Sequence, residues 1–571
     1  MKGVDRVRYL DALDLRSAGS WPAVLAAIAV VVMIVLARGE VDFSYQDPDF
    51  RFIAIAIGSL LVLGRRLPLL VWAWWGWGAL THVWSLAPGN THVTAIWEVT
   101  YLAAFAAASW RPAFWIVSVA VLSDGAFSVL ALASVGLSDY TSGSINYVVG
   151  ALALAVVPVL VAKGMGAKDW IWTALWGVAG STVVYLALAS GSRAVYLPLA
   201  LVVLAIFARV ANDRSYRLSR AALLAASTVL GVVALEVVLP GGPLASAFGL
   251  KLTVGAQVGA AGEYGAFSQR LRFWDQTLEI ARAHPLGSGL GSYQAVIHAF
   301  QKYPMLWSNS PHNYFIETIA TGGWPRLALL VVLLAISTIS TWKSGSWAWV
   351  LGALALWVTF AFDVTSYYPS VMMFAFLALG ASYYRVRPAA EKADTVCIST
   401  PALKRGVAVI GLVAATGLAA WWFVPCTGTG CYLTRFHGVP NLATQNLAEV
   451  ESGQRNDVLN RLRELYPKSL WVLRLEQRYA ERAEDHLAIA AEIARRFPLQ
   501  SPQNYLDWAT AAMAVGDSKQ AVEAVREGLA VFGPDDYPYG EQRMTPELYR
   551  SWLDQADAIL VLAGERPPSP P

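Results

Sequence analysis

The stretch INYVVGALALAVVPVLVA, residues 145–162, contains no charged side chain, and apolar runs of similar length recur along the chain. A helix that spans a membrane needs about 20 mainly apolar residues. The sequence therefore predicts an all-α fold, a polytopic bundle of transmembrane helices. The thirteen predicted spans lie near residues 21–37, 51–64, 67–86, 95–110, 112–135, 145–162, 169–190, 193–210, 221–240, 325–342, 346–362, 368–384 and 405–424.

The overall composition agrees with a membrane protein. Of the 571 residues, 56% are hydrophobic and 15% are charged, whereas a soluble domain carries about 25% charged residues. The chain contains 24 Trp and 23 Tyr, which favour the interface between water and lipid. This composition excludes a disordered chain, a disulfide scaffold and an ordinary cytosolic enzyme. The net charge of +3 is too small to indicate a nucleic-acid partner.

The distribution of Lys and Arg predicts how the bundle is oriented. Cytoplasmic loops carry an excess of these residues, and a cytoplasmic N-terminus places them consistently in the inner loops. The basic residues of those loops are Arg65, Arg66, Arg111, Lys163, Lys168, Arg209, Arg214, Arg217, Arg220, Lys343, Arg385, Arg387, Lys392, Lys404 and Arg405. An odd number of spans puts the C-terminus outside. Residues 241–312 and 425–571 are therefore predicted to be extracytoplasmic.

The C-terminal segment is charged and has the pattern of soluble helices. Residues from Asn504 to Pro534 resemble a tetratricopeptide repeat, because small or apolar residues occupy the positions that this repeat requires: Gly516, Ala521, Val525 and Gly528. The helices predicted before it, 443–465 and 470–497, look like degenerate copies. Such a domain either binds peptide or protein segments or packs on its neighbours, and the sequence leaves both interpretations open.

These segments predict two domains. Residues 1–424 form a transmembrane domain with the extracytoplasmic loop 241–312, and residues 425–571 form an extracytoplasmic helical domain. Cys426 and Cys431 are candidates for a disulfide, since they are five residues apart outside the cytoplasm. The cysteine spacing is not that of a metal site.

The loop 241–312 holds most of the candidate chemistry. Residues 270–282 are predicted to form an amphipathic helix with one apolar face: Leu271, Trp274, Leu278 and Ala281. The other face is polar: Arg270, Arg272, Asp275, Gln276, Glu279 and Arg282. The following segment HPLGSGLG, residues 284–291, ends the helix. Its glycines are poor evidence for a nucleotide loop, because no strand precedes them.

Two residues outside this helix also attract interest. His312 lies at the outer mouth of a predicted spanning helix, where an imidazole can exchange a proton near neutral pH; alternatively, it caps the helix or bonds a carbonyl. Arg193 lies outside, against the charge bias, and could contact a lipid headgroup, snorkel or bind an anionic substrate. Within the spans, Glu98, Asp124 and Glu236 are either functional acids or partners in bonds between helices.

In combination, these residues resemble the O-antigen ligase and polymerase superfamily, membrane enzymes that move glycans from a polyprenyl diphosphate carrier. Ser192-Arg193 resembles the Ser-Arg pair that the family has at the outer end of a span. The helix from Arg270 to Trp274 and the turn from His284 to Gly289 resemble the helix and glycine turn of its large periplasmic loop.

A third feature resembles the ligase signature. It consists of His312-Asn313, nine residues and Gly323. The signature continues with Gly, Thr or Tyr three residues later, where this chain has Arg326. The resemblance covers about residues 185–342.

The resemblance implies an inverting, metal-independent glycosyltransferase that needs no cofactor. Arg193 and Arg270 would stabilise the departing diphosphate of an undecaprenyl diphosphate-linked donor, since guanidinium groups match phosphate oxygens bidentately. His312 would orient the acceptor hydroxyl and take its proton. Further candidates for substrate binding are Arg272, Asn313, His284, Gly289 and Glu317.

The predicted function is ligase-type transfer of a glycan to a lipid or protein hydroxyl, on the outer face of a bacterial inner membrane. The helical tail favours a protein acceptor such as a pilin. The alternative is a polysaccharide polymerase, in which a second lipid-linked repeat unit is the acceptor. A flippase or transporter is less favoured, because the candidate residues gather at the outer face and not at the midplane.

Overall fold

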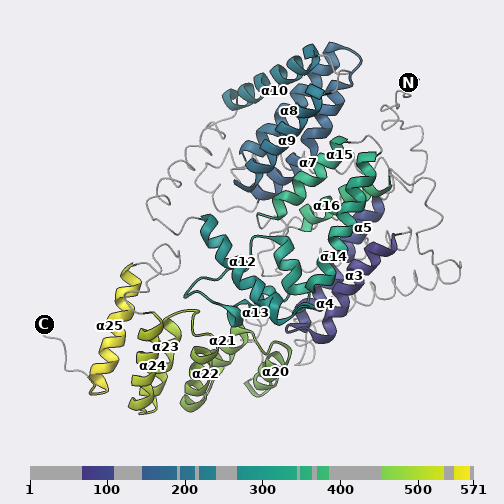
Figure 1. Cartoon of the computed structure of the whole chain (residues 1–571). Coiled ribbons are helices and arrows are strands. Elements are labelled where there is room, and N and C mark those ends of the chain that lie inside the picture. Colours follow the sequence, from purple (N-terminus) through teal and green to yellow (C-terminus); the bar gives the residue numbers. More distant parts are fainter. Residues whose placement is uncertain are drawn as a thin grey trace, which may run out of the picture. The chain divides into compact units, whose positions relative to one another are not determined.

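The computed structural model is built from helices throughout the part of the chain that it describes (Figure 1). The described residues are 67–108, 145–189, 193–212, 218–238, 266–343, 347–362, 369–384, 452–532 and 546–565. The predicted spans 21–37, 51–64, 112–135 and 405–424 and both disulfide candidates, Cys426 and Cys431, lie outside them. The chain divides into two compact units.

The first unit consists of residues 1–76, 96–254 and 328–424. Its described helices lie in the apolar runs of the sequence, because long apolar segments satisfy their backbone groups best within a helix. They are α5 Val99–Ala107, α7 Ile145–Met165, α8 Trp170–Ala189, α9 Arg193–Asn212, α10 Leu218–Val238, α15 Trp347–Phe360 and α16 Pro369–Tyr384.

Small residues bring these helices close together. A Cβ atom on Gly177 of α8 would lie 1.8 Å from Oγ of Ser227 in α10, so only glycine allows this approach. The hydroxyl of Tyr185 in α8 donates a hydrogen bond to Glu236 in α10 over 2.8 Å. Glu236 therefore takes part in a bond between helices, which was one of its two predicted roles.

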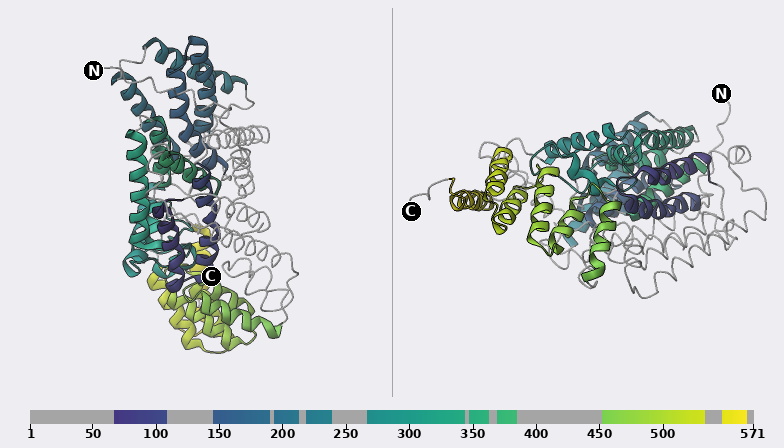
Figure 2. Two further views of the ribbon diagram at one scale, coloured as in Figure 1. Left: turned by 90° about the vertical axis from the view of Figure 1, so that its right-hand side faces the viewer. Right: turned by 90° about the horizontal axis from the view of Figure 1, so that it is seen from below.

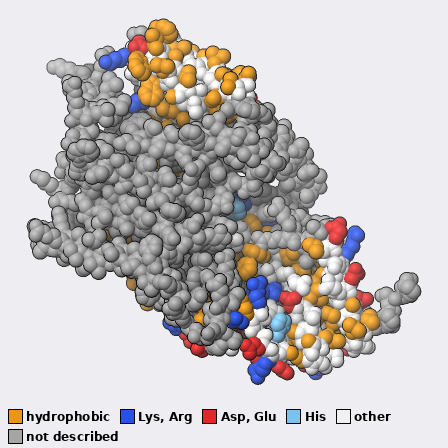
Figure 3. Space-filling model, turned by 180° about the vertical axis from the view of Figure 1, so that it is seen from behind, with side chains coloured by type: hydrophobic (Ala, Val, Ile, Leu, Met, Phe, Trp, Pro, Cys, Tyr) orange, Lys and Arg blue, Asp and Glu red, His pale blue; other side chains and the backbone are white. Residues whose placement is uncertain are grey.

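Two helices are long and apolar enough to cross a membrane among the residues described, Leu218–Val238 and Tyr314–Ile339. Shorter apolar helices accompany them: Ala155–Met165, Val195–Ala211, Val350–Phe360 and Val371–Tyr383. Helices α8, α9 and α10 also expose large apolar side chains, including Trp170, Phe207 and Leu230, and Figure 3 shows hydrophobic side chains gathered over this part of the molecule. Such a surface suits lipid contact.

The second unit consists of residues 77–95, 255–327 and 425–571. The elements of its first two segments are the end of α3 Leu69–Leu80, η2 Thr81–Trp84, most of α4 Pro88–Trp97, α12 Ala266–Ala283, α13 Tyr293–Val296, η5 Ile297–Phe300 and the start of α14 Tyr314–Lys343. The predicted helix 270–282 is therefore confirmed as part of α12. Helix α14 was predicted to run on through Gly322-Gly323, but Gly323 has non-helical angles (φ 76°, ψ 173°) and divides it.

The C-terminal helices follow one another as a row (Figure 2). They are α20 Ser452–Leu465, α21 Leu470–Tyr479, α22 Ala483–Arg496, α23 Gln503–Ala514, α24 Ser518–Val531 and α25 Pro546–Leu562. The prediction of one helix over 470–497 is wrong. Ala480 and Arg482 adopt extended backbone angles between α21 and α22, and neither residue type signals a break.

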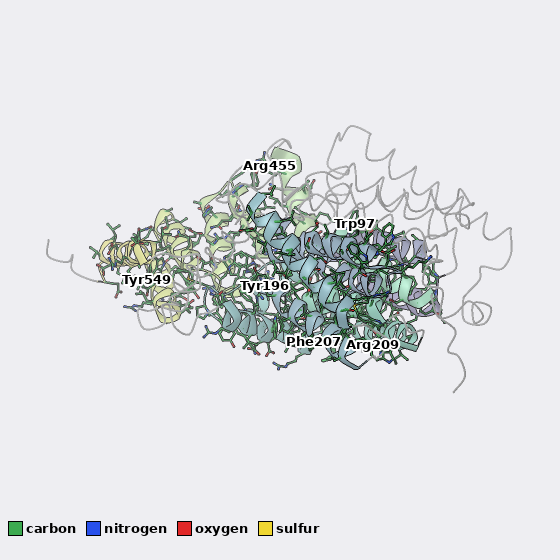
Figure 4. All side chains as sticks on the ribbon, turned by 90° about the horizontal axis from the view of Figure 1, so that it is seen from above. Trp97, Tyr196, Phe207, Arg209, Arg455 and Tyr549 are labelled. Carbon is green, nitrogen blue, oxygen red and sulfur yellow. The ribbon has the colours of Figure 1, made fainter. Side chains whose placement is uncertain are left out.

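The α23–α24 pair uses its small residues for close packing. Gly516 turns the chain between the two helices with φ 80°, a conformation that glycine adopts without steric cost. A Cβ atom on Gly528 would lie 2.8 Å from Cβ of Tyr505. Helix α25 closes the row, because Tyr549 donates a hydrogen bond to the carbonyl of Phe532 over 2.6 Å (Figure 4).

Candidate functional site

Helix α12 is the scaffold of the site, and its buried face differs from the predicted one. Gln276, Thr277 and Ile280 are fully buried, whereas Leu271 is 46% exposed. The prediction placed Gln276 on the polar face, opposite the apolar one. It is buried because both ends of its side-chain amide bond to main-chain groups, Leu306 O and Lys302 N, which removes the cost of burying a polar group.

Helix α12 also places His312. The indole N–H of Trp274 donates to the carbonyl of Pro311 over 2.8 Å, and the ring of Phe273 lies nearly parallel to the imidazole, with centroids 6.0 Å apart. The N–H of His312 donates to Oγ of Ser310 over 3.0 Å. His312 has φ 55°, a left-handed conformation that non-glycine residues adopt rarely and that is often found at functional sites.

The surroundings of His312 keep its imidazole neutral. Burial, as the larger cause, and the positive charge of Arg270 together lower the pKa of His312 from 6.5 to about 4. Its Nδ1 atom is buried and makes no hydrogen bond to the part of the chain that is described. At neutral pH the side chain therefore offers an uncharged ring that can accept a proton.

The structure brings one predicted arginine to this histidine. Arg270 precedes Phe273 and Trp274 by three and four residues and so lies on the same face of α12, where it acts electrostatically on His312. Arg272 lies on another face, with its guanidinium 5.4 Å from the ring centre of Tyr303. Arg193 is the first residue of α9 in the first unit, and its side chain is outside the described residues.

Asn313 and Glu317 lie at the start of α14. The side-chain oxygen of Asn313 accepts hydrogen bonds from the N–H groups of Phe315 and Ile316, at 3.0 and 3.1 Å, which caps the helix. Glu317 lies in the first turn, near the buried hydroxyl of Tyr293. Burial raises the pKa of Tyr293, and the charge of Glu317 raises it further. The residue that caps α14 is therefore Asn313. Helix capping had been one of the interpretations considered for its neighbour His312.

His284 lies at the other end of α12. It lies eleven positions after Phe273, which corresponds to roughly 16 Å along a helix. Its ring packs edge-on against Phe300, and burial, with the charge of Lys468 as a second cause, lowers the pKa of His284. Within the second unit, His284 therefore belongs to the contact between the loop and the C-terminal helices.

The glycine turn after His284 joins the loop to the break in α14. The N–H groups of Ser288 and Gly289 donate to the carbonyls of Ala320 and Thr321, at 2.9 and 3.0 Å. Trp324 N–H donates back to Pro285 over 3.1 Å. Gly289 has φ 116°, and a Cβ atom there would lie 1.9 Å from Oγ of Ser85. These contacts show that close packing accounts for the glycines of this turn.

Arg326, the departure from the ligase signature, is the largest charged side chain of this junction. It is 1% exposed. Its guanidinium packs against Gly78, so closely that a Cβ atom on Gly78 would lie 2.5 Å from it. The aliphatic part of the same side chain packs against Gly322. Arg326 therefore fills the space beside the break in α14.

The described residues contain no group of three or more His, Cys, Asp and Glu side chains that could hold a metal ion. The candidate chemistry in the second unit consists of His312 and Arg270, both positioned by α12.

Comparison with known proteins supports the interpretation of this segment. Residues 178–331 match the family described as O-Antigen ligase. This range includes Arg193, α12, the glycine turn, His312 and Gly323. No curated protein matches the chain.

Proposed function

We propose, from the premise that residues 178–331 form a domain of the O-antigen ligase superfamily, that the protein transfers a glycan from an undecaprenyl diphosphate carrier to an acceptor hydroxyl. Members of this superfamily are membrane enzymes that transfer glycans as ligases or polymerases. The observation that carries the proposal is the neutral, buried imidazole of His312, which packs against α12 and feels the charge of Arg270 on that helix.

The reaction then proceeds as a direct displacement. The acceptor oxygen attacks the anomeric carbon and gives its proton to the neutral imidazole of His312. The bond between that carbon and the diphosphate oxygen breaks, and the diphosphate leaves with the electron pair. Arg270 and Arg193 stabilise the developing charge. Displacement from the opposite side inverts the anomeric centre.

Donor binding makes His312 a better base. In the free protein the positive charge of Arg270 opposes protonation of His312. A bound diphosphate brings negative charge to the arginine and so favours the imidazolium form. The pKa of His312 therefore rises when the donor is present, toward the range in which a general base works best.

The proposal extends to the organisation of the whole chain. We place the enzyme in a bacterial inner membrane with thirteen spans, a cytoplasmic N-terminus and an extracytoplasmic C-terminal domain. The apolar helices and their exposed side chains support the membrane location. The small-residue contacts of the α23–α24 pair support a tetratricopeptide-like arrangement of the tail. Arg272, Asn313 and Glu317 have an indirect role in substrate binding. They stabilise α12, the histidine-containing loop and the start of α14, and do not contact the substrate themselves.

The test uses purified full-length protein, a lipid diphosphate-linked glycan and a candidate lipid or protein acceptor. His312→Ala is expected to lower the rate of transfer about 10²- to 10⁴-fold, the usual contribution of a general base. Arg270→Ala is expected to lower it on the order of 10²- to 10³-fold. Normal transfer by His312→Ala would refute the assignment of the site.

Two matched variants control for nonspecific damage. Arg282→Ala removes an exposed arginine from the same helix, and His486→Ala removes a histidine from α22; both should transfer at the wild-type rate. Incubation with donor alone separates the two reaction types. A product ladder without added acceptor identifies a polymerase, whereas product only with an acceptor identifies a ligase.

A further inference from the structure

The C-terminal helices share hydrophobic cores with the loop that carries the site. Leu462 of α20, Tyr466 directly after it and Val472 of α21 are buried in one cluster with Ile280 of α12 and Tyr293 of α13. The loop and these helices belong to the same compact unit. The tail therefore completes the interior of the loop and is not joined to it by a linker alone.

A single turn of the tail is bonded to the segment that leads to the histidine. We call residues 301–312 the histidine segment. The carbonyl of Leu499, between α22 and α23, accepts hydrogen bonds from Met305 N–H at 2.6 Å and from the side-chain amide of Gln301 at 2.7 Å. The side chain of Met305 is buried in the core of the tail, although its φ of 57° is unfavourable for methionine.

Helix α12 holds the same segment from within the loop. The side-chain amide of Gln276 donates to Leu306 O over 3.0 Å, and its oxygen accepts from Lys302 N–H over 2.9 Å. Two residues earlier on the helix, Trp274 bonds to Pro311. The histidine segment is thus bonded to the tail near its start and to α12 at both ends.

These bonds restrict the freedom of His312. Loss of the Gln276 amide leaves the buried carbonyl of Leu306 and the partly buried N–H of Lys302 without their partners. Because an unsatisfied buried carbonyl is costly, the segment is expected to move to satisfy it. A displacement of about 1 Å is enough to slow a positioned reaction on the order of a hundredfold.

We propose that Gln276 and the Leu499 turn are positioning groups for His312, so that the C-terminal helices take part in building the catalytic site. The proposal rests on the proposed function, because it assumes that His312 is the base. It gives the tail a role that is independent of any acceptor that the tail binds.

The test compares Gln276→Met and Gln301→Met in the full-length protein. Both variants keep the size of the side chain and remove its amide, and Gln301 is only partly buried, so its variant is the milder one. Hydrogen exchange of peptides from residues 301–312 should become faster. The turnover number should fall about tenfold or more, with little change in KM for the donor, since the phosphate-binding arginines are untouched.

The pH profile distinguishes positioning from a loss of folded protein. A loosened segment exposes His312 to water, so the acid limb of the turnover number should move to higher pH. The turnover number is expressed per folded protein, with the folded fraction measured at each pH, so that partial unfolding alone would leave the profile in place. Gln555→Met on α25 replaces an exposed glutamine and should change neither exchange in this segment nor turnover.

Two results would overturn the proposal. Unchanged exchange in both variants would show that the bonds do not hold the segment. Faster exchange with wild-type turnover and pH profile would show that the segment does not position the base. A wild-type protein that transfers nothing from a lipid diphosphate donor would refute the proposed function itself, and with it the catalytic meaning of these bonds.

Discussion

The environment of His312 has a measurable consequence at the scale of one residue. Its pKa is about 4 in the folded protein, below the ordinary value near 6.5 that an unfolded chain would show. The unfolded chain therefore binds more protons than the folded one between these values, and folding stability rises with pH through this window. At neutral pH the contribution of the neutral His312 side chain to folding stability is fully present.

We expect acid to destabilise the wild-type protein more than His312→Gln. The difference between pKa values of 6.5 and about 4 corresponds to about 3–4 kcal/mol at most, lost progressively as the pH falls from about 6.5 to about 4. The thermal midpoint of the purified protein, measured at intervals across this range, should fall less steeply for His312→Gln. His284 contributes in the same direction in both proteins. Parallel curves would contradict the assignment of the low pKa.

The site shows which residue roles can be predicted from sequence. The resemblance to a family directed attention to His312 and Arg270, and the structure brings these two side chains close enough to interact electrostatically; their catalytic roles stay a prediction. The burial of Gln276 was not predictable, because its partners Lys302 and Leu306 lie 26 and 30 positions further along the chain. Helical periodicity separates apolar from polar residues. It cannot reveal that main-chain groups distant in sequence supply the hydrogen bonds that allow a polar side chain to be buried.

At the scale of elements, the junction between the glycine turn and α14 depends on Gly323. A Cβ atom there would lie 2.3 Å from the carbonyl carbon of Leu286, a main-chain atom that cannot move alone. Gly323 also has φ 76°. Steric overlap and an unfavourable backbone conformation therefore coincide at one position.

We expect Gly323→Ala to lower the thermal midpoint far more than either of two reference variants. Gly516→Ala meets no atom within 4 Å but keeps φ 80°, so it should cost about 1–2 kcal/mol for the left-handed conformation alone. Gly76→Ala meets no atom and has no positive φ, so it should be neutral or slightly stabilising in α3. Equal thermal midpoints for Gly323→Ala and Gly516→Ala would show that the junction rearranges to accommodate the added methyl group, which would contradict this prediction.

The positions of most described helices were predictable, because long apolar runs leave few alternatives to a helix in a membrane. The breaks were less so. The break at Gly323 depends on the glycine turn some 36 residues earlier, at Gly287, whose backbone it meets. The break between α21 and α22 contains Ala480 and Arg482, which favour helices by themselves. Tertiary packing decides the break at Gly323, and nothing in the structure explains the break between α21 and α22.

At the scale of the whole molecule, the second unit is assembled from three segments that are far apart in sequence. No local pattern links Tyr466 and Val472 of the tail to Tyr293 of the loop, although they share a core. The sequence therefore left open whether the tail binds an acceptor or packs on its neighbours. The shared core supports packing, and the two roles predict different results when the tail is removed.

We expect deletion of residues 452–571 to abolish transfer to every acceptor, because Ile280 and Tyr293 would lose the α20 and α21 side chains that bury them. The experiment compares transfer to a lipid acceptor and to a protein acceptor by the truncated enzyme in membranes, with insertion checked by a protease-protection pattern that matches that of the full-length protein. Deletion of residues 566–571, which leaves α25 intact, serves as the control and should preserve activity. A tail that only captures a protein acceptor would give a different result: transfer to the protein would be lost, while transfer to the lipid acceptor would continue at the wild-type rate.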